Sequence, residues 1–114
     1  QNLDSGIPKI GFALASASNG ELERGIWSMH KALKYYPVAL KQIKHEQQIH
    51  TILSVLNEQY QYSASNKSEP KQYHFMIAAL SYLQGDINTA QQYLSLTDDT
   101  PSTKNLSILI NQSL

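Results

Sequence analysis

The fold is decided by residues 20–37, which read GELERGIWSMHKALKYYP, and by residues 85–96, GDINTAQQYLSL, which repeat one pattern. Each stretch opens with a glycine, an acidic residue and an apolar residue. A tiny residue follows at Gly25 or Ala90, and a large apolar residue comes one helical turn later. Glycine permits a tight turn between antiparallel helices, and a tiny residue allows two helices to approach closely where they cross. The pattern therefore predicts two helix hairpins.

Apolar residues elsewhere recur at three- and four-residue intervals, which is typical of amphipathic helices. Ile26, Met29 and Leu33 form one such stripe, and the alternation expected of strands is almost absent. The sequence predicts an all-α fold with a single domain over residues 1–114. The six expected helices cover about 5–18, 20–35, 38–61, 70–83, 86–97 and 101–112.

The helix expected over 38–61 is the least regular of the six, because its apolar stripe changes sides near His45. Such a change indicates either a break near His45 or one long helix that is contacted on two faces. Neither glycine nor proline lies between Pro37 and Pro70. We therefore expect a continuous helix.

The two hairpins resemble the tetratricopeptide repeat, a helix hairpin of about 34 residues. The resemblance implies hairpins over about 5–37 and 69–100, a degenerate one over 38–68, and a capping helix at 101–112. These units would stack as a short right-handed superhelix, whereas an orthogonal helical bundle is the competing arrangement. The matching positions are Phe12, Ala13, Gly20, Gly25, Met29, Ala32 and Pro37 in the first unit and Ile77, Ala78, Gly85, Ala90 and Leu94 in the last.

Two departures from the family pattern stand out. Residues 38–70 lack the turn glycine, and Lys9 and His74 replace the aromatic residue that usually opens the repeat. The second unit is therefore the one that the resemblance describes least well.

The family binds peptides on the surface of its first helices, so the resemblance also implies a partner-binding groove here. Core packing is the competing interpretation of the same residues. For aromatic residues at helical spacing, Trp27 included, core or half-buried packing is the default. The implied groove is lined by Ile7, Ile10, Leu14, Phe75, Ala79 and Tyr82.

A basic face is a second candidate site. Lys31, Lys34, Lys41 and Lys44 gather around Pro37. Such a face could bind an acidic peptide or a phosphate-bearing partner. The alternative is that these lysines only form the solvated side of two helices.

Composition argues against several classes of function. Nine Lys and Arg balance nine Asp and Glu, so no net charge favours nucleic acid or an anionic membrane as a partner. No apolar run reaches the roughly 18 to 20 residues of a membrane span, so we expect no direct membrane insertion. Cysteine is absent, which excludes thiolate chemistry.

Motifs for chemistry are also missing from the sequence. His45 and His50 are five positions apart, which puts them on different sides of a helix, so we expect no metal site. No nucleophile elbow, phosphate loop or dinucleotide fingerprint occurs. We therefore expect no catalytic residues, no cofactor and no enzymatic activity.

Uncharged polar residues and the N-terminal residue bear on the compartment. The chain is rich in uncharged polar residues, with 11 Gln, 7 Asn and 13 Ser, as is common in extracytoplasmic bacterial domains. It begins at Gln1 rather than at methionine, so we expect a processed chain or a piece of a longer one. The composition thus leans towards the bacterial periplasm and leaves the oligomeric state open.

Together these patterns predict a non-catalytic module that binds a protein or peptide, as part of a larger bacterial assembly, an adaptor or a membrane-anchored regulator. The alternative is a helical sensor domain that binds a small ligand. The first function predicts an exposed groove with apolar and aromatic residues, and the second predicts an internal cavity.

Overall fold

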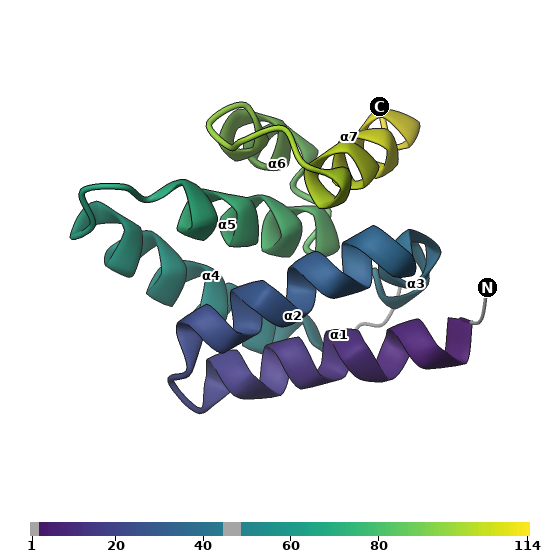
Figure 1. Cartoon of the computed structure of the whole chain (residues 1–114), viewed down its shortest axis with the longest axis horizontal. Coiled ribbons are helices and arrows are strands. Elements are labelled where there is room, and N and C mark those ends of the chain that lie inside the picture. Colours follow the sequence, from purple (N-terminus) through teal and green to yellow (C-terminus); the bar gives the residue numbers. More distant parts are fainter. Residues whose placement is uncertain (1–2, 45–48) are drawn as a thin grey trace.

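Helices form the regular structure of the chain, as the apolar periodicity predicted. The computed structural model describes residues 3–44 and 49–114. All regular elements in these two ranges are helical, which confirms the all-α prediction (Figure 1). The seven α-helices of the described residues are α1 (Leu3–Ser18), α2 (Leu22–Tyr35), α3 (Pro37–Ile43), α4 (His50–Ser65), α5 (Lys71–Leu83), α6 (Ile87–Leu94) and α7 (Pro101–Gln112).

The two predicted hairpins, α1–α2 and α5–α6, share one turn geometry. The turn glycine has a positive φ in both, 87° at Gly20 and 82° at Gly85. The N–H of the residue after each glycine donates to the carbonyl five positions back, at Ser16 and at Ser81, over 2.9 Å in both cases. This closure ends the first helix of each hairpin, and a residue with a side chain would be strained at the glycine. The predicted turn glycines are confirmed.

The close crossing predicted at Gly25 is also confirmed. A Cβ atom built at Gly25 would lie 3.0 Å from the carbonyl oxygen of Ala13 on α1. It would lie 2.7 Å from the hydroxyl oxygen of Tyr60, which the sequence did not reveal as a neighbour. That hydroxyl donates to the carbonyl of Leu22 over 2.8 Å. The absence of a side chain at Gly25 therefore lets α1 pack closely against α2 and leaves space for the Tyr60 side chain of α4.

The region 38–61 differs from the prediction. α3 ends at Ile43 and α4 begins at His50, and residues 45–48 are outside the described ranges. α3 packs against α1 and α2, whereas α4 packs against α5. The apolar stripe changes sides because its two halves face different neighbours. The described residues form two helices here and not the one continuous helix that we expected over 38–61, and the predicted hairpin over 38–68 stays a prediction, because residues 45–48 lie outside the described ranges.

α7 begins where the sequence predicted and packs more widely than predicted. Thr100 caps it by accepting a hydrogen bond from the N–H of Thr103 over 3.2 Å. The helix contacts α6, as expected, but its most extensive contact is with α2, and it also reaches α3 and α5. Leu106, Leu109 and Ile110 are buried in these contacts. α7 thus joins the two hairpins.

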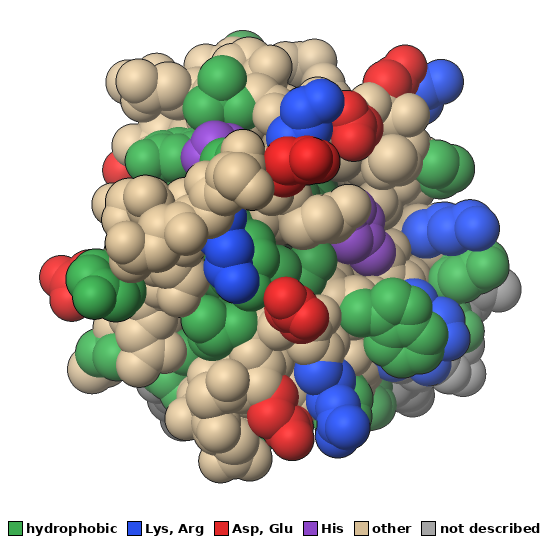
Figure 2. All heavy atoms as spheres, turned by 60° about the vertical axis from the view of Figure 1, so that its left-hand side comes forward, with side chains coloured by type: hydrophobic (Ala, Val, Ile, Leu, Met, Phe, Trp, Pro, Cys, Tyr) green, Lys and Arg blue, Asp and Glu red, His purple; other side chains and the backbone are tan. Residues whose placement is uncertain are grey.

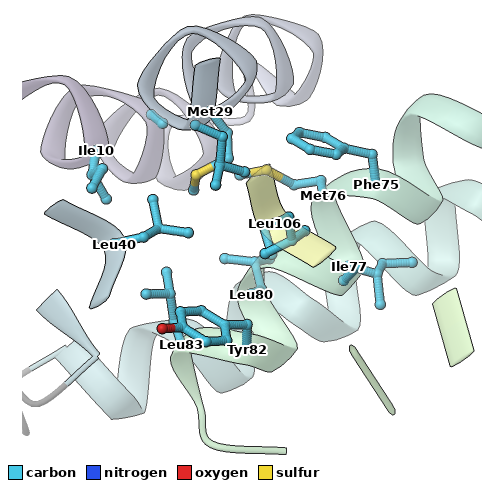
Figure 3. Packing of buried hydrophobic residues seen from close by; sticks show 14 of the residues in the cluster. Ile10, Met29, Leu40, Phe75, Met76, Ile77, Leu80, Tyr82, Leu83 and Leu106 are labelled. Carbon is cyan, nitrogen blue, oxygen red and sulfur yellow. The ribbon is translucent and has the colours of Figure 1, made fainter. Parts of the chain in front are cut away.

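The interior is one cluster of apolar side chains to which all seven helices contribute. In Figure 3, side chains from α1, α2, α3, α5 and α7 point into a shared space. α5 is the most enclosed element, since every residue from Phe75 to Leu83 is buried. Its neighbours are α2, α3, α4, α6 and α7. The surface available for binding therefore belongs mainly to the outer helices.

Candidate functional site

The groove that the family resemblance implied is part of the core. The inner face of α1 is covered by α2 and α3, and α5 lies among five other helices. Of the six predicted groove residues, only Ile7 is well exposed, at 40%. The prediction of a groove along α1 and α5 is therefore wrong, and the competing interpretation as core is correct. The five buried residues, each at most 6% exposed, are Ile10, Leu14, Phe75, Ala79 and Tyr82.

The four lysines of the predicted basic face fall into two pairs with different neighbours. Lys41 and Lys44 donate to side chains at the C-terminal end of α7, over 3.5 and 3.2 Å. Positive charge is favourable there because the last carbonyls of a helix carry partial negative charge. Lys31 and Lys34 lie on α2 instead, and each ammonium is close to an aromatic ring. Lys41 and Lys44 thus contact another helix, whereas Lys31 and Lys34 lie on the solvent-facing side of α2.

Exposed aromatic side chains mark the outer side of the first hairpin. Trp27, the single tryptophan of the chain, is 60% exposed, and Phe12 is 51% exposed. Of the two expected placements, core and half-buried, the structure excludes the core for Trp27. Its position gives the reason, since the buried stripe of α2 includes Ile26 and Met29, and Trp27 is rotated about 100° from Ile26. That rotation was visible in the sequence.

Trp27 separates two open grooves, and the first of them lies between α1 and α2. We call it the lysine groove; its volume is about 660 Å³. The ammonium of Lys31 lies 4.3 Å from the centroid of the Trp27 ring, and Lys9 contributes from α1. Among the side chains that the structure describes, no carboxylate lines it. The lining residues are Pro8, Lys9, Phe12, Trp27, Ser28, Lys31 and Tyr36.

The second groove, of about 620 Å³, lies between α2 on one side and the α4–α5 connection with the first turn of α5 on the other. We call it the mixed groove, because Glu23, Glu69 and Lys67 all line it. The hydroxyl of Tyr73 donates to Glu23 over 3.4 Å, and the Lys67 ammonium lies 5.1 Å from the Tyr73 ring centroid. Figure 2 brings this end of the molecule forward and shows hydrophobic side chains among charged side chains of both signs. The other lining residues are Ile26, Trp27, His30 and Gln72.

A serine and a histidine far apart in sequence meet beside the mixed groove. The His30 ring stacks on Phe75 with centroids 3.6 Å apart, its Nδ1 contacts the Ser102 hydroxyl, and its Nε2 lies 2.9 Å from Oε1 of Gln72. Burial lowers the pKa of His30, and the hydrogen bond to Gln72 opposes that shift. Ser102 is only 3% exposed, whereas a nucleophile must reach its substrate. These contacts of His30 connect α2 to α7 through Ser102 and to α5 through Gln72.

None of the helices in the described ranges is long and apolar enough to cross a membrane. Within those ranges, no three His, Asp or Glu side chains lie together as metal ligands would. His45, the first member of the histidine pair considered above, lies outside the described residues.

Comparisons with protein-family models, with curated proteins and with solved structures gave no match. In the described residues, the fold and the surface together define an all-α domain in which an exposed tryptophan lies between two of the open grooves.

Proposed function

We propose that the chain is a non-catalytic module that binds a protein or peptide segment at the outer face of its first hairpin. The observation that carries this proposal is the exposure of Phe12 and Trp27 in the lysine groove. Clustered apolar surface next to charged groups is typical of protein-binding sites, and tryptophan is enriched among the residues that dominate binding energy.

The packing of the first hairpin supports the same function. α1 and α2 pack along each other, their turn is closed by Gly20, and α2 is anchored by Tyr60 from α4. A groove that is formed before the partner arrives incurs little ordering cost on binding. The resemblance to the tetratricopeptide repeat, whose members bind peptides, agrees with this function, although the groove proposed here lies between two helices of one hairpin.

Site-specific photo-crosslinking tests the proposal. Benzoylphenylalanine would replace Phe12 in the lysine groove or, as a control, Tyr62, which is 74% exposed on α4. In an extract of the source cells, we expect discrete cross-linked polypeptides from position 12 and none of them from position 62. Excess unlabelled wild-type chain should suppress these products, and the Trp27→Ala chain should not. Identical products from both positions, or none from position 12, would contradict the proposal.

A further inference from the structure

We propose that the lysine groove binds an acidic segment of a partner protein, in which carboxylates flank a large apolar side chain. This inference rests on the proposed function and specifies the chemistry of the partner. It goes beyond the proposal of protein or peptide binding, because it predicts a preference for acidic peptides over others of the same length and apolar content.

The charges around the groove favour an acidic partner. Lys9 comes from α1 and Lys31 from α2, so the two ammonium groups belong to opposite walls. The described carboxylates near Trp27, Glu23 and Glu69, line the other groove. Complementary charge is a main source of specificity in protein recognition. Carboxylates on both sides of the bound segment would match both walls.

The aromatic side chains of the groove favour an apolar side chain in the partner. Phe12 and Trp27 are each about half exposed and line the same groove as the two lysines. The Lys31 ammonium already lies over the Trp27 ring, so the positive charge stays next to the apolar surface and does not extend into the solvent. An apolar side chain of the partner would cover the rings, while an adjacent carboxylate reaches the ammonium.

Other occupants fit the charges less well. A nucleic acid would need an extended run of cations, whereas the chain has no net charge and carries Glu23 and Glu69 on the far side of Trp27. A second copy could offer Asp98 and Asp99. Asp98, however, already pairs with Lys71 over 2.9 Å, and Asp99 lies 4.0 Å from Lys104, so both carboxylates already have a cation of their own chain beside them.

Intrinsic fluorescence provides the test, because the single tryptophan of the chain lies in the groove. The probes are three synthetic peptides of equal length without Trp or Tyr. Each has a central Leu-Phe pair, flanked by Glu, by Gln or by Lys. Titrations of the whole chain at low salt should show that the Glu peptide binds about fivefold to tenfold more tightly than the Gln peptide, and the Lys peptide most weakly. The preference should shrink as salt is raised.

Charge reversal supplies the matched variants. Lys31→Glu should weaken binding of the Glu peptide about tenfold, whereas Lys104→Glu, in the groove between α6 and α7, should leave it unchanged. The double variant Lys9→Glu/Lys31→Glu should prefer the Lys peptide. Circular dichroism of each variant establishes that it is folded.

Several results would overturn the inference. If all three peptides bound the wild type equally and Phe12→Ala abolished their binding, the groove would bind peptides without an acidic preference. Binding of none of the peptides would remove the inference, while the cross-linking experiment would decide separately on the proposed function. Tighter binding of oligothymidylate than of the Glu peptide would assign the groove to nucleic acid. Self-association in sedimentation that Lys31→Glu abolishes would assign it to a second copy.

Discussion

At the scale of single residues, Gly6 occupies a position that the sequence pattern did not mark. A Cβ atom built there would lie 2.5 Å from Cβ of Tyr36 and 2.7 Å from Cβ of Ala39. α1 therefore touches the start of α3 almost backbone to backbone. Gly25 could be predicted because it belongs to a repeated pattern, whereas the neighbours of Gly6 become apparent only when α3 folds back on α1.

Replacing Gly6 by alanine should lower the free energy of unfolding by about 1 to 3 kcal/mol, because the added methyl group overpacks the contact with α3. Gly11 is the matched control on the same helix, since it is exposed and nothing lies within 4 Å of a Cβ built there. Gly11→Ala should raise the free energy of unfolding by about 0.5 to 1 kcal/mol through helix propensity. Urea unfolding of both variants measures the difference, and equal values would contradict the close packing at Gly6.

His30 should make stability depend on pH. Burial lowers its pKa in the folded state, so the unfolded state takes up a proton more readily. The contribution of neutral His30 is complete above the ordinary histidine pKa of about 6.5 and is lost as the pH falls below it. The charged side chains that line a cavity together with His30 are the ion pair Lys71–Asp98, at 2.9 Å, and Glu23, Lys67 and Glu69 of the mixed groove. We expect the wild type to lose more stability between neutral and mildly acidic pH than His30→Gln.

Denaturant unfolding across this pH range measures the effect. His50→Gln serves as the control, since His50 lies at the first position of α4 and shares none of the contacts of His30. If wild type, His30→Gln and His50→Gln lost stability in parallel, His30 would not be the group that titrates.

At the scale of elements, Ala90 tests the second hairpin. It is fully buried on α6, the helix that packs along α5. Ala90→Leu should overpack this contact and cost about 1 to 3 kcal/mol of the free energy of unfolding. Asn88→Leu, at an exposed position of α6, is the control and should change stability little. Thermal unfolding midpoints of the two variants should therefore separate, and coincident midpoints would place Ala90 away from a close crossing.

The sequence predicts helices well where a local signal marks their ends. Gly20 and Gly85 mark the two tight turns, and Thr100 and Pro101 mark the start of α7. The end of α3 at Ile43 has no such marker, because tertiary packing determines it. The change of side in the apolar stripe was the available signal for a break. We gave more weight to the absence of glycine and proline, and the expectation of a continuous helix was the result.

At the scale of the whole molecule, the grooves depend on which helices cover which faces. The sequence singled out Lys31 as part of a basic face, but it could not pair it with Lys9, because the two lie on different helices. It assigned apolar residues of α1 and α5 to a groove, but the packing of α2 and α3 on α1, and of five helices around α5, buried all of them except Ile7. Exposure of Trp27 followed from its place beside the buried stripe of α2. Composition and periodicity therefore predict the fold class better than they predict the surface.

α7 connects the two hairpins, so its removal should affect the whole molecule. It buries Leu106, Leu109 and Ile110 against α2 and its neighbours, and each fully buried side chain of this kind contributes up to about 1.5 to 3 kcal/mol. A chain that stops at Asp99 would expose the apolar surface on both sides of this contact. We expect it to melt at a much lower temperature than the whole chain, or to aggregate.

A point substitution makes the same test without truncation. Leu106→Ala should cost about 2 to 5 kcal/mol, because Leu106 is fully buried, whereas Ile108→Ala on the exposed side of α7 should cost far less. Calorimetric melting of both variants and of the shortened chain would settle the role of α7. If the shortened chain stayed monomeric with an unchanged melting temperature, α7 would be a detachable arm. The contact of His30 with Ser102 would then contribute nothing to holding the hairpins together, because the rest of the fold would be stable without it.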